Sequence, residues 1–351
     1  MTSDTKHSIR VGLFDSPVFW EHDAGPGHPE RPERLEAVRR GLREAGLEGD
    51  LTVREPRPAT REELLRVHTA AHVDRVAATE GGRHRFDSDT EAGPRSHAAA
   101  LRAAGAVVEA VDAVLAGTLD RAFCAVRPPG HHATPARAMG FCFFNNVAVG
   151  AAHARAQGLS RVAIVDFDVH HGNGTQEMFW TDPQVLYVSS HAFPFYPGTG
   201  ALEEVGEGAG RGFTVNLPMP SGLGDGDYAL AYRRIVEPIG RAFDPELVLV
   251  STGFDAHRDD PLAGMSLTAA GFAELADVCL ALADGAARGR AVFVLEGGYN
   301  LQAIAEATAA VVGRLLDRER PAPDLRPGPR AEPLVEAYRR VHAPCWPPLA
   351  R

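Results

Sequence analysis

Seven short apolar runs recur along the chain and have the character of buried β-strands. They are rich in Val, Ile, Leu and Phe, which favour strands, and polar or turn-forming residues follow them. Segments with apolar residues at helical spacing and many good helix formers alternate with them. The strand runs are 10–15, 121–126, 161–167, 185–190, 213–218, 246–251 and 291–298, and the helical segments are 30–46, 96–117, 145–157, 226–243, 267–287 and 301–317.

This alternation predicts an α/β fold. Its sheet is expected to be mostly parallel, with about eight strands sandwiched between helices, because each crossover helix covers a face of the sheet. The stretch 318–333 is rich in proline and charged residues, which predicts an extended connector, and a short helix is expected at 331–341. We therefore predict one domain over 1–317 and a tail over 318–351 that packs on or next to it.

The charge and the cysteine content argue against several classes of protein. The formal net charge is −10 and there is no block of Lys or Arg, which argues against binding to nucleic acid or to a membrane surface. The four cysteines form no C-x-x-C pair, so neither a disulfide framework nor a thiolate zinc site is indicated. Residues 1–10, which include the only lysine, Lys6, lack the apolar core of a signal peptide. No apolar run reaches the ~18 residues that a spanning helix needs, so a soluble cytoplasmic protein is expected.

Unusual polar segments follow four of the predicted strands. They are RPPGHH (127–132), DFDVHHGNG (166–174), GFDAHRDDP (253–261) and EGGYN (296–300). Ligands of open parallel sheets bind beyond the carboxyl ends of the strands, because loops from several strands converge there. The four segments are therefore expected to form one site.

The second segment contains a D-x-H sequence that can bind a metal ion. Asp168 and His170 are two positions apart, so in an extended segment their side chains point to the same side. Asp255, beyond another strand, can supply a third ligand. Such a set leaves coordination positions open, as a catalytic zinc requires, although iron(II) or manganese would also suit it. A lone D-x-H is usually a solvated loop, but the second acid and the neighbouring histidines favour a metal site.

The other segments carry groups suited to acid–base chemistry. His131 and His132 follow a rigid Pro-Pro-Gly turn and can carry protons near neutral pH. Asp166 can accept a hydrogen bond from one ring, and Asn173 from the other. Tyr299 can donate its phenol hydrogen to a carbonyl oxygen that becomes negative during reaction. Taken singly, each also has a structural explanation, as a core histidine or a buried aromatic cap.

Together these motifs resemble the zinc-dependent histone deacetylase and acetylpolyamine amidohydrolase superfamily, which shares its fold with arginases. The resemblance implies the arginase/deacetylase fold and hydrolysis of acetyl-lysine, or of another N-acetylated amine, to acetate and free amine. The variants FCFFNN and HHGNGTQ are similar to those of bacterial class II-like members. The resemblance is carried in order by GPGHPERPERL (25–35), RPPGHHA (127–133), MGFCFFNNVAVGA (139–151), VDFDVHHGNGTQ (165–176), YPGTG (196–200), GFDAHRDDPLAG (253–264) and LEGGYN (295–300).

The resemblance assigns roles to the reacting residues. It makes the Asp/His/Asp set described above the ligands of one catalytic zinc ion. Tyr299 corresponds to the phenol that polarises the substrate carbonyl, His132 to the general base and acid, and His131 to its electrostatic partner. A structural potassium site, formed partly by backbone carbonyls, is implied at Asp166, Asp168, His170, Ser189 and Ser190.

The resemblance also implies how the substrate is held. Gly140, Phe141 and Tyr196 correspond to the walls of a tunnel for an extended acyl-lysine. Asp89 corresponds to a loop acid that grips the substrate backbone, and Arg34 to an arginine near an internal acetate channel. Loops 16–29 and 78–95 are expected to shape the mouth of the tunnel.

Three positions differ from one or another branch of the family. Asn173 stands where one branch pairs an acid with the second histidine, and Glu296 in EGGY stands where class I members have glycine. Leu262 replaces the acidic gatekeeper of a polyamine-selective branch, which weakens the case for strict acetylpolyamine preference.

Several alternatives stay open on sequence alone. The substrate is either the acetylated lysine of a protein or a small acetylated amine, as for an acetylpolyamine amidohydrolase. A manganese ureohydrolase would need a second set of bridging acids, which the chain does not obviously offer. A non-catalytic acyl-lysine-binding module would not need the two histidines and Tyr299. Association of copies into a homo-oligomer is also left open.

Overall fold

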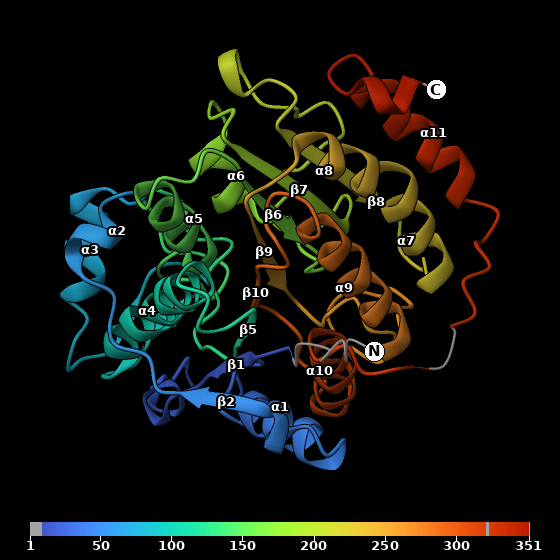
Figure 1. The fold of residues 1–351 in the computed structure, drawn as a ribbon. Coiled ribbons are helices and arrows are strands. Elements are labelled where there is room, and N and C mark those ends of the chain that lie inside the picture. Colours follow the sequence, from blue (N-terminus) through green and yellow to red (C-terminus); the bar gives the residue numbers. More distant parts are fainter. Residues whose placement is uncertain (1–8, 321–322, 351) are drawn as a thin grey trace, which may run out of the picture.

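The computed structural model, which describes residues 9–320 and 323–350, is built on one large sheet. All neighbouring strands of this sheet run parallel (Figure 1). The predicted α/β fold with a parallel sheet of about eight strands is therefore confirmed. Lys6 and part of the connector, residues 321–322, lie outside the described residues. The sheet order is β2 (Leu51–Arg54), β1 (Val11–Phe14), β5 (Arg121–Cys124), β10 (Ala291–Leu295), β9 (Leu247–Thr252), β6 (Val162–Asp166), β7 (Val185–Ala192) and β8 (Thr214–Met219).

The seven predicted strands are all present because their residues are buried on both faces of the sheet. Every residue of β5, β6, β9 and β10 is buried. Strand β2 was not predicted, because it lies at an edge and half of its short sequence faces water; Val53 is 65% exposed. A separate antiparallel pair, β3 (His84–Arg85) and β4 (Glu91–Ala92), lies outside the main sheet.

Helices cover both faces of the sheet, as Figure 1 shows. Helices α4 and α5 pack on one face, and α9 and α10 on the other, where α1 packs against α10 and α7 against α9. Among the described residues, the structure contains no helix of sufficient length and hydropathy to cross a bilayer. The bounds are α1 (Glu33–Glu44), α2 (Arg61–Leu64), α3 (Ala70–Ala77), α4 (Ser96–Leu115), α5 (Asn146–Ala156), α6 (Asn173–Phe179), α7 (Asp225–Ala231), α8 (Glu237–Phe243), α9 (Ala269–Ala283) and α10 (Leu301–Leu315).

All six predicted helical segments are found, with one irregularity. The segment predicted at 226–243 consists of α7 and α8 joined by a π-helical turn, Tyr232–Val236. Helices α2, α3 and α6 were not predicted, because they are only 4, 8 and 7 residues long. A capping box in which Thr60 and Glu63 bind each other's backbone N–H marks the start of α2, and it is the local signal that identifies such a short helix.

The C-terminal tail lies along the β8 edge of the sheet. Its helix α11 (Ala331–His342), expected at 331–341, packs against α7 and β8 (Figure 1). The Tyr338 hydroxyl donates to the Pro218 carbonyl at 2.8 Å, and Trp346 Nε1 donates to the Gly212 carbonyl at 2.8 Å. The tail therefore covers backbone and side chains at an edge that would otherwise face water.

Candidate active site

The four polar segments meet at one end of the sheet. They follow β5, β6, β9 and β10, which are neighbours in the order β5, β10, β9, β6. A cavity of about 230 Å³ opens there, as expected for the carboxyl ends of parallel strands. Its lining includes most of the predicted catalytic and tunnel residues: Asp89, Pro129, His131, His132, Gly140, Phe141, His170, Phe195, Tyr196, Leu262, Gly297 and Tyr299.

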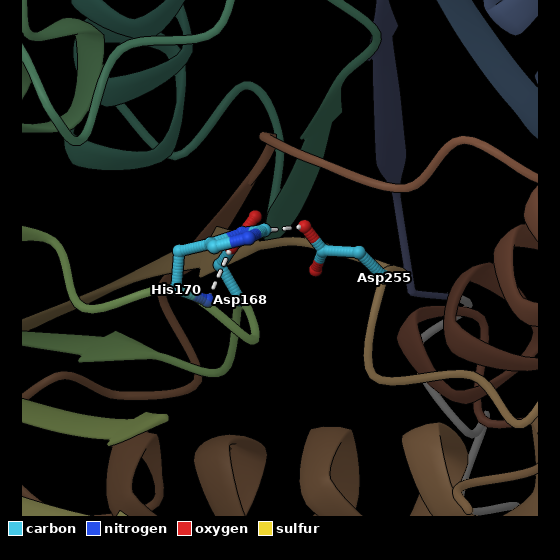
Figure 2. A group of neighbouring side chains, drawn as sticks. All are labelled: Asp168, His170 and Asp255. Atoms are coloured by element: carbon cyan, nitrogen blue, oxygen red, sulfur yellow. Dashed lines mark hydrogen bonds and ion pairs between the residues drawn. The ribbon is translucent and has the colours of Figure 1, made fainter. Parts of the chain in front are cut away.

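Three of the predicted metal-binding side chains come together beside this cavity (Figure 2). One ligand atom from each of Asp168, His170 and Asp255 lies within 4.8 Å of the others. His170 Nδ1 is 3.3 Å from Asp168 Oδ1 and 3.1 Å from Asp255 Oδ2. Both carboxylates are fully buried, so water cannot compensate their charge. The arrangement is chemically suited to a cation that takes nitrogen and oxygen ligands.

Backbone groups hold the two carboxylates in place. Gly297 N donates to Asp168 Oδ2 at 2.7 Å, and Val169 N donates to Asp255 Oδ1 at 3.0 Å. A side chain at Gly297 would place a Cβ 2.2 Å from Asp255 Oδ2, so only glycine permits this close approach. Burial and the adjacent charge of Asp168 raise the pKa of Asp255. A bound cation would remove this repulsion.

The two adjacent histidines have different partners. His131 Nδ1 donates to Asp166 Oδ2 at 3.0 Å, whereas His132 Nδ1 donates to Asn173 Oδ1 at 2.8 Å. Burial disfavours the charged His131 ring, but the carboxylates of Asp168 and Asp166 outweigh it and raise its pKa to about 10. Burial, with the charges of His131 and His170, holds the pKa of His132 well below its ordinary value. The pair therefore combines one charged ring with one neutral ring whose Nε2 can accept a proton.

Tyr299 stands at the cavity on the loop that follows β10. Burial raises the pKa of its phenol well above the ordinary value, although the nearby Arg34 opposes the shift, so the phenol keeps its proton. The Arg34 guanidinium lies 5.2 Å from the centre of the Tyr299 ring. Arg34 is fully buried, and its Nε donates to the Gly298 carbonyl at 2.7 Å. Arg34 thus supports the backbone beside Tyr299 from behind the cavity.

Unusual backbone forms one wall of the cavity. Gly140 and Phe141 both have positive φ, at 55° and 68°. A Cβ at Gly140 would lie 2.4 Å from His132 Cδ2. Both this close approach and the positive φ therefore require glycine at position 140. The Phe141 ring contacts Tyr299 edge to face at 5.8 Å, and Tyr196 contacts His132 in the same way at 5.1 Å. The wall is therefore aromatic and packed directly against the reacting groups.

The predicted loop acid and the two predicted serines lie near these groups. Asp89 lines the cavity, and Asp87 Oδ1 accepts a hydrogen bond from its backbone N–H at 3.1 Å. Ser189 lies in register with Asp166 on the neighbouring strand. Ser189 and Ser190 are fully buried, and both hydroxyls hydrogen-bond to protein side chains. Their side chains are therefore engaged, whereas their carbonyls belong to the central sheet.

Two buried charged residues that sequence reasoning missed support the site from behind. Glu30 Oε1 accepts from Arg34 Nη1 at 3.0 Å, and Glu30 Oε2 accepts from Arg127 Nη2 at 2.7 Å. All three side chains are at most 1% exposed. The four-residue spacing of Glu30 and Arg34 within HPERPER was the available signal, because it is the spacing of an ion pair along a helix.

Glu296 and Asp260 were also missed as site residues. Glu296 Oε2 accepts from Gly130 N at 2.7 Å and from His131 N at 3.1 Å, so it holds the turn that carries both histidines. Burial raises the pKa of Glu296 to about 7, against the opposing charge of His131. Asp260 is 7% exposed and binds the backbone N–H of Tyr299 at 2.6 Å. Neither role is visible in sequence, because the bound backbone belongs to a distant segment.

Comparison with known proteins gives concordant matches. A family model described as the histone deacetylase domain matches residues 28–315. A probable deacetylase of Archaeoglobus fulgidus is 40% identical, over 96% of this chain and 98% of that protein. Histone deacetylase 15 of Arabidopsis thaliana is 42% identical over 99% of this chain and 64% of that protein. Histone deacetylase clr3 of Schizosaccharomyces pombe is 44% identical over 82% of this chain and 45% of that protein.

A solved structure agrees with these relatives. The crystal structure of the HDA15 HD domain matches with a TM-score of 0.92 and 40% identity, over 98% of this chain and 97% of that chain. The chain spans almost the whole archaeal relative but about half to two thirds of the plant and yeast proteins. The predicted arginase/deacetylase fold and family are thereby confirmed. The chain belongs to the histone deacetylase family and is a deacetylase, a hydrolase that acts on linear amide C–N bonds.

Proposed function

We propose that the chain is a zinc-dependent deacetylase that cleaves the amide of an acetylated lysine side chain and releases acetate and the free amine. One observation carries this proposal. The Asp168, His170 and Asp255 side chains, the His131 and His132 pair and the Tyr299 phenol all gather at one cavity.

The ligand chemistry fits zinc. Two carboxylates and one imidazole supply the oxygen and nitrogen ligands that an open catalytic zinc site uses. When bound, zinc would activate a water and polarise the substrate carbonyl. We also infer a structural potassium ion at Asp166, Asp168, His170, Ser189 and Ser190; the in-register, buried placement of Asp166 and Ser189 supports it.

The side chains at the cavity carry out the proton transfers and stabilise the charge that develops during the reaction. His132, with its Nδ1 proton directed at Asn173, accepts the proton of the attacking water through Nε2. His131, held by Asp166, places a positive charge beside the developing oxyanion. The protonated Tyr299 donates a hydrogen bond to the carbonyl oxygen as its negative charge grows. A histidine then returns a proton to the amine leaving group.

The cavity walls suit an extended alkyl chain. Phe141, Phe195 and Tyr196 present aromatic surface to it, and Leu262 stands on the same lining. In this proposal Asp89, which lines the cavity, accepts hydrogen bonds from the substrate backbone. The charge of Arg34, which is buried beside the Tyr299 ring, attracts the acetate that leaves. The apolar Leu262 favours the neutral methylene chain of a lysine over a second cationic amine.

We also propose that 1–317 forms one catalytic domain and 318–351 a tail fastened to it. Contacts across the division support this view. Arg320 Nη2 binds Glu274 at 2.6 Å and Asp277 at 2.8 Å, which fastens the connector to α9.

The test is amine release by the zinc-loaded enzyme from a matched panel of substrates. The panel contains acetyl-, trifluoroacetyl- and longer acyl-lysine peptides beside acetylated spermidine, putrescine and cadaverine. Acetyl-lysine peptides are expected to be the best substrates. Tyr299→Phe should lose about 100-fold or more in kcat while its zinc content, measured by elemental analysis, stays that of the wild type.

Other outcomes would redirect the proposal. A preference for the small amines would make the chain an acetylpolyamine amidohydrolase whose selectivity comes from its mouth loops. Tight binding of acyl-lysine peptides by the zinc-loaded protein without turnover of any substrate would support an acyl-lysine-binding module and contradict the proposal. Full activity with manganese alone on a guanidine substrate would point to a ureohydrolase.

A further inference from the structure

Asp260 binds two loops of the site at once. Its Oδ2 accepts hydrogen bonds from Tyr299 N at 2.6 Å and Asn300 N at 3.1 Å. Its Oδ1 accepts from Leu262 N at 3.1 Å. The first two N–H groups belong to the loop after β10, and the third to the loop after β9. A buried carboxylate, 7% exposed, therefore ties together the two loops that carry Tyr299 and Leu262 to the cavity.

The backbone around Tyr299 needs such an anchor. Tyr299 follows Gly297 and Gly298, and Gly298 has a φ of 109°, which only glycine adopts readily. Two successive glycines carry no side chains that could anchor this segment, so hydrogen bonds hold it, from Phe254 N to the Gly297 carbonyl at 3.0 Å and from Arg34 Nε to the Gly298 carbonyl at 2.7 Å. Immediately after it, Asn300 caps α10 by accepting hydrogen bonds from Gln302 N and Ala303 N. Tyr299 thus lies between a glycine pair and a fixed helix start, where its own backbone N–H also needs a partner.

The bonds to Asp260 act at this point of the chain. They immobilise the amides of Tyr299 and Asn300 relative to the loop that holds the Asp255 ligand. A second tie, from Asn300 Nδ2 to the Asp259 carbonyl at 2.9 Å, links the same loops but leaves the Tyr299 amide free. Arg34 binds the carbonyl of the peptide group that joins Gly298 to Tyr299, and Asp260 binds the N–H of that same group. Asp260 therefore supplies the bond to the Tyr299 N–H and, unlike Arg34, links it to the loop after β9.

We propose that Asp260 is a positioning residue: by binding the backbone of Tyr299, Asn300 and Leu262, it fixes the phenol over the reacting carbonyl and holds Leu262 in the cavity lining. The inference rests on the proposed function. Misplacement of a catalytic group by about 1 Å costs about 100-fold in rate. Loss of Asp260 should therefore lower kcat through Tyr299, without removing any atom that touches the substrate.

A double-mutant cycle tests this role. Asp260→Ala should lower kcat by about 10- to 100-fold in the wild-type background but less than about 3-fold in the Tyr299→Phe background, because no phenol is left to position. Asp260→Asn, whose amide oxygen can serve one loop but not both, should fall between wild type and Asp260→Ala. An equal loss of kcat in both backgrounds would show that Asp260 only stabilises the fold and would overturn the proposal.

The chain offers a matched control at the other end of the sheet. Glu246 Oε2 accepts from Ser160 N at 2.6 Å and from Arg161 N at 2.9 Å, so it also binds two successive amides of another loop. Glu246→Ala removes the same kind of contact far from the cavity. It should leave kcat within about 3-fold of the wild type.

A spectroscopic measurement separates this inference from the proposed activity. The protein is labelled with 3-fluorotyrosine at its six tyrosines, and Tyr299→Phe identifies the ¹⁹F resonance of Tyr299. Asp260→Ala should shift and broaden that resonance, whereas Glu246→Ala should leave it unchanged. An unaltered Tyr299 resonance overturns the positioning role even if no substrate is turned over. If Asp260→Ala does not fold, the same comparison is made with Asp260→Asn.

Discussion

Replacing Glu30 by glutamine is expected to destabilise the protein strongly. The Glu30 carboxylate lies between the guanidinium groups of Arg34 and Arg127, and it is also 3.1 Å from His22 Nε2. None of these four side chains is more than 1% exposed. Glutamine keeps the volume of the side chain but removes its charge. The two buried cations are then left without the carboxylate that compensates them.

The size of the effect follows from the burial of the group. Removal of one partner of a buried ion pair costs about 3–5 kcal/mol of the free energy of unfolding. Glu36 supplies a matched control, because it pairs with Arg43 at 3.2 Å while both side chains are about half exposed, at 52% and 53%. Glu36→Gln should cost about 0–1 kcal/mol. The two variants should therefore differ by about 2–5 kcal/mol.

Urea unfolding followed by circular dichroism measures this difference, and its pH dependence tests the cause. Burial alone would raise the pKa of Glu30, but the charge of Arg127 and the contact with His22 outweigh it, so the pKa lies well below its ordinary value. Such a group stabilises the fold above its unfolded pKa, about 4.3, and the contribution disappears as pH falls through the lower folded pKa. The gap between wild type and Glu30→Gln should stay constant between about pH 6 and 8 and close only in acid.

Either of two results would contradict a charge-compensating role for Glu30. One is a loss of stability for Glu30→Gln of less than about 1 kcal/mol, no larger than that of Glu36→Gln. The other is a stability difference between wild type and Glu30→Gln that disappears above neutral pH rather than in acid. A carboxylate with a lowered pKa stays charged above neutral pH, so it cannot cause such a change.

Four further predictions concern single positions. Gly105→Ala should destabilise the protein by about 1–3 kcal/mol despite the better helix propensity of alanine, because its Cβ would lie 1.9 Å from a backbone oxygen. Gly313→Ala, whose nearest neighbour is 4.0 Å away, should stabilise by about 0.5–1 kcal/mol; thermal unfolding measures both. Gly140→Ala should reduce kcat by about 100-fold or more in steady-state assays, because its Cβ would displace the His132 ring. Trp346→Phe should cost about 1–3 kcal/mol in urea unfolding, because the buried carbonyl that it binds loses its donor. Wild-type stability of the Gly105, Gly313 or Trp346 variant, or wild-type kcat of Gly140→Ala, would contradict the contact that the variant tests.

The pattern of apolar residues predicted the strands and helices correctly wherever an element is buried, because burial requires apolar side chains. The central strands are buried on both faces and therefore appear as continuous apolar runs, as in 161–167 and 246–251. Strand β2 was not predicted, because its sequence, LTVR, is only partly apolar, as suits an edge strand that faces water on one side. Helix α6 was not predicted, because its residues, NGTQEMF, include a glycine and follow directly on the histidine motif.

The candidate site was predictable as a set of motifs but not as a set of contacts. The rule that ligands bind at strand ends brought together segments that lie far apart in the chain. The supporting carboxylates of Glu30, Glu296 and Asp260 were not predicted, because the role of a buried acid depends on which groups it binds. Glu30 and Arg127 are 97 positions apart, and Asp260 binds an amide 39 positions away. A local sequence pattern cannot predict a contact between residues that lie so far apart in the chain.

Part of the substrate-facing wall lies on segments that carry no reacting group. Asp89, Phe195 and Tyr196 belong to the loops after β3 and β7, whereas Phe141 shares the segment after β5 with the two histidines, and Leu262 shares the segment after β9 with Asp255. The loops that carry Asp89, Phe195 and Tyr196 can be lengthened or exchanged without altering the strand ends that carry the reacting groups. A library that varies only such loops would therefore explore new amide substrates on a constant catalytic core, which makes this chain a suitable scaffold for evolving selectivity.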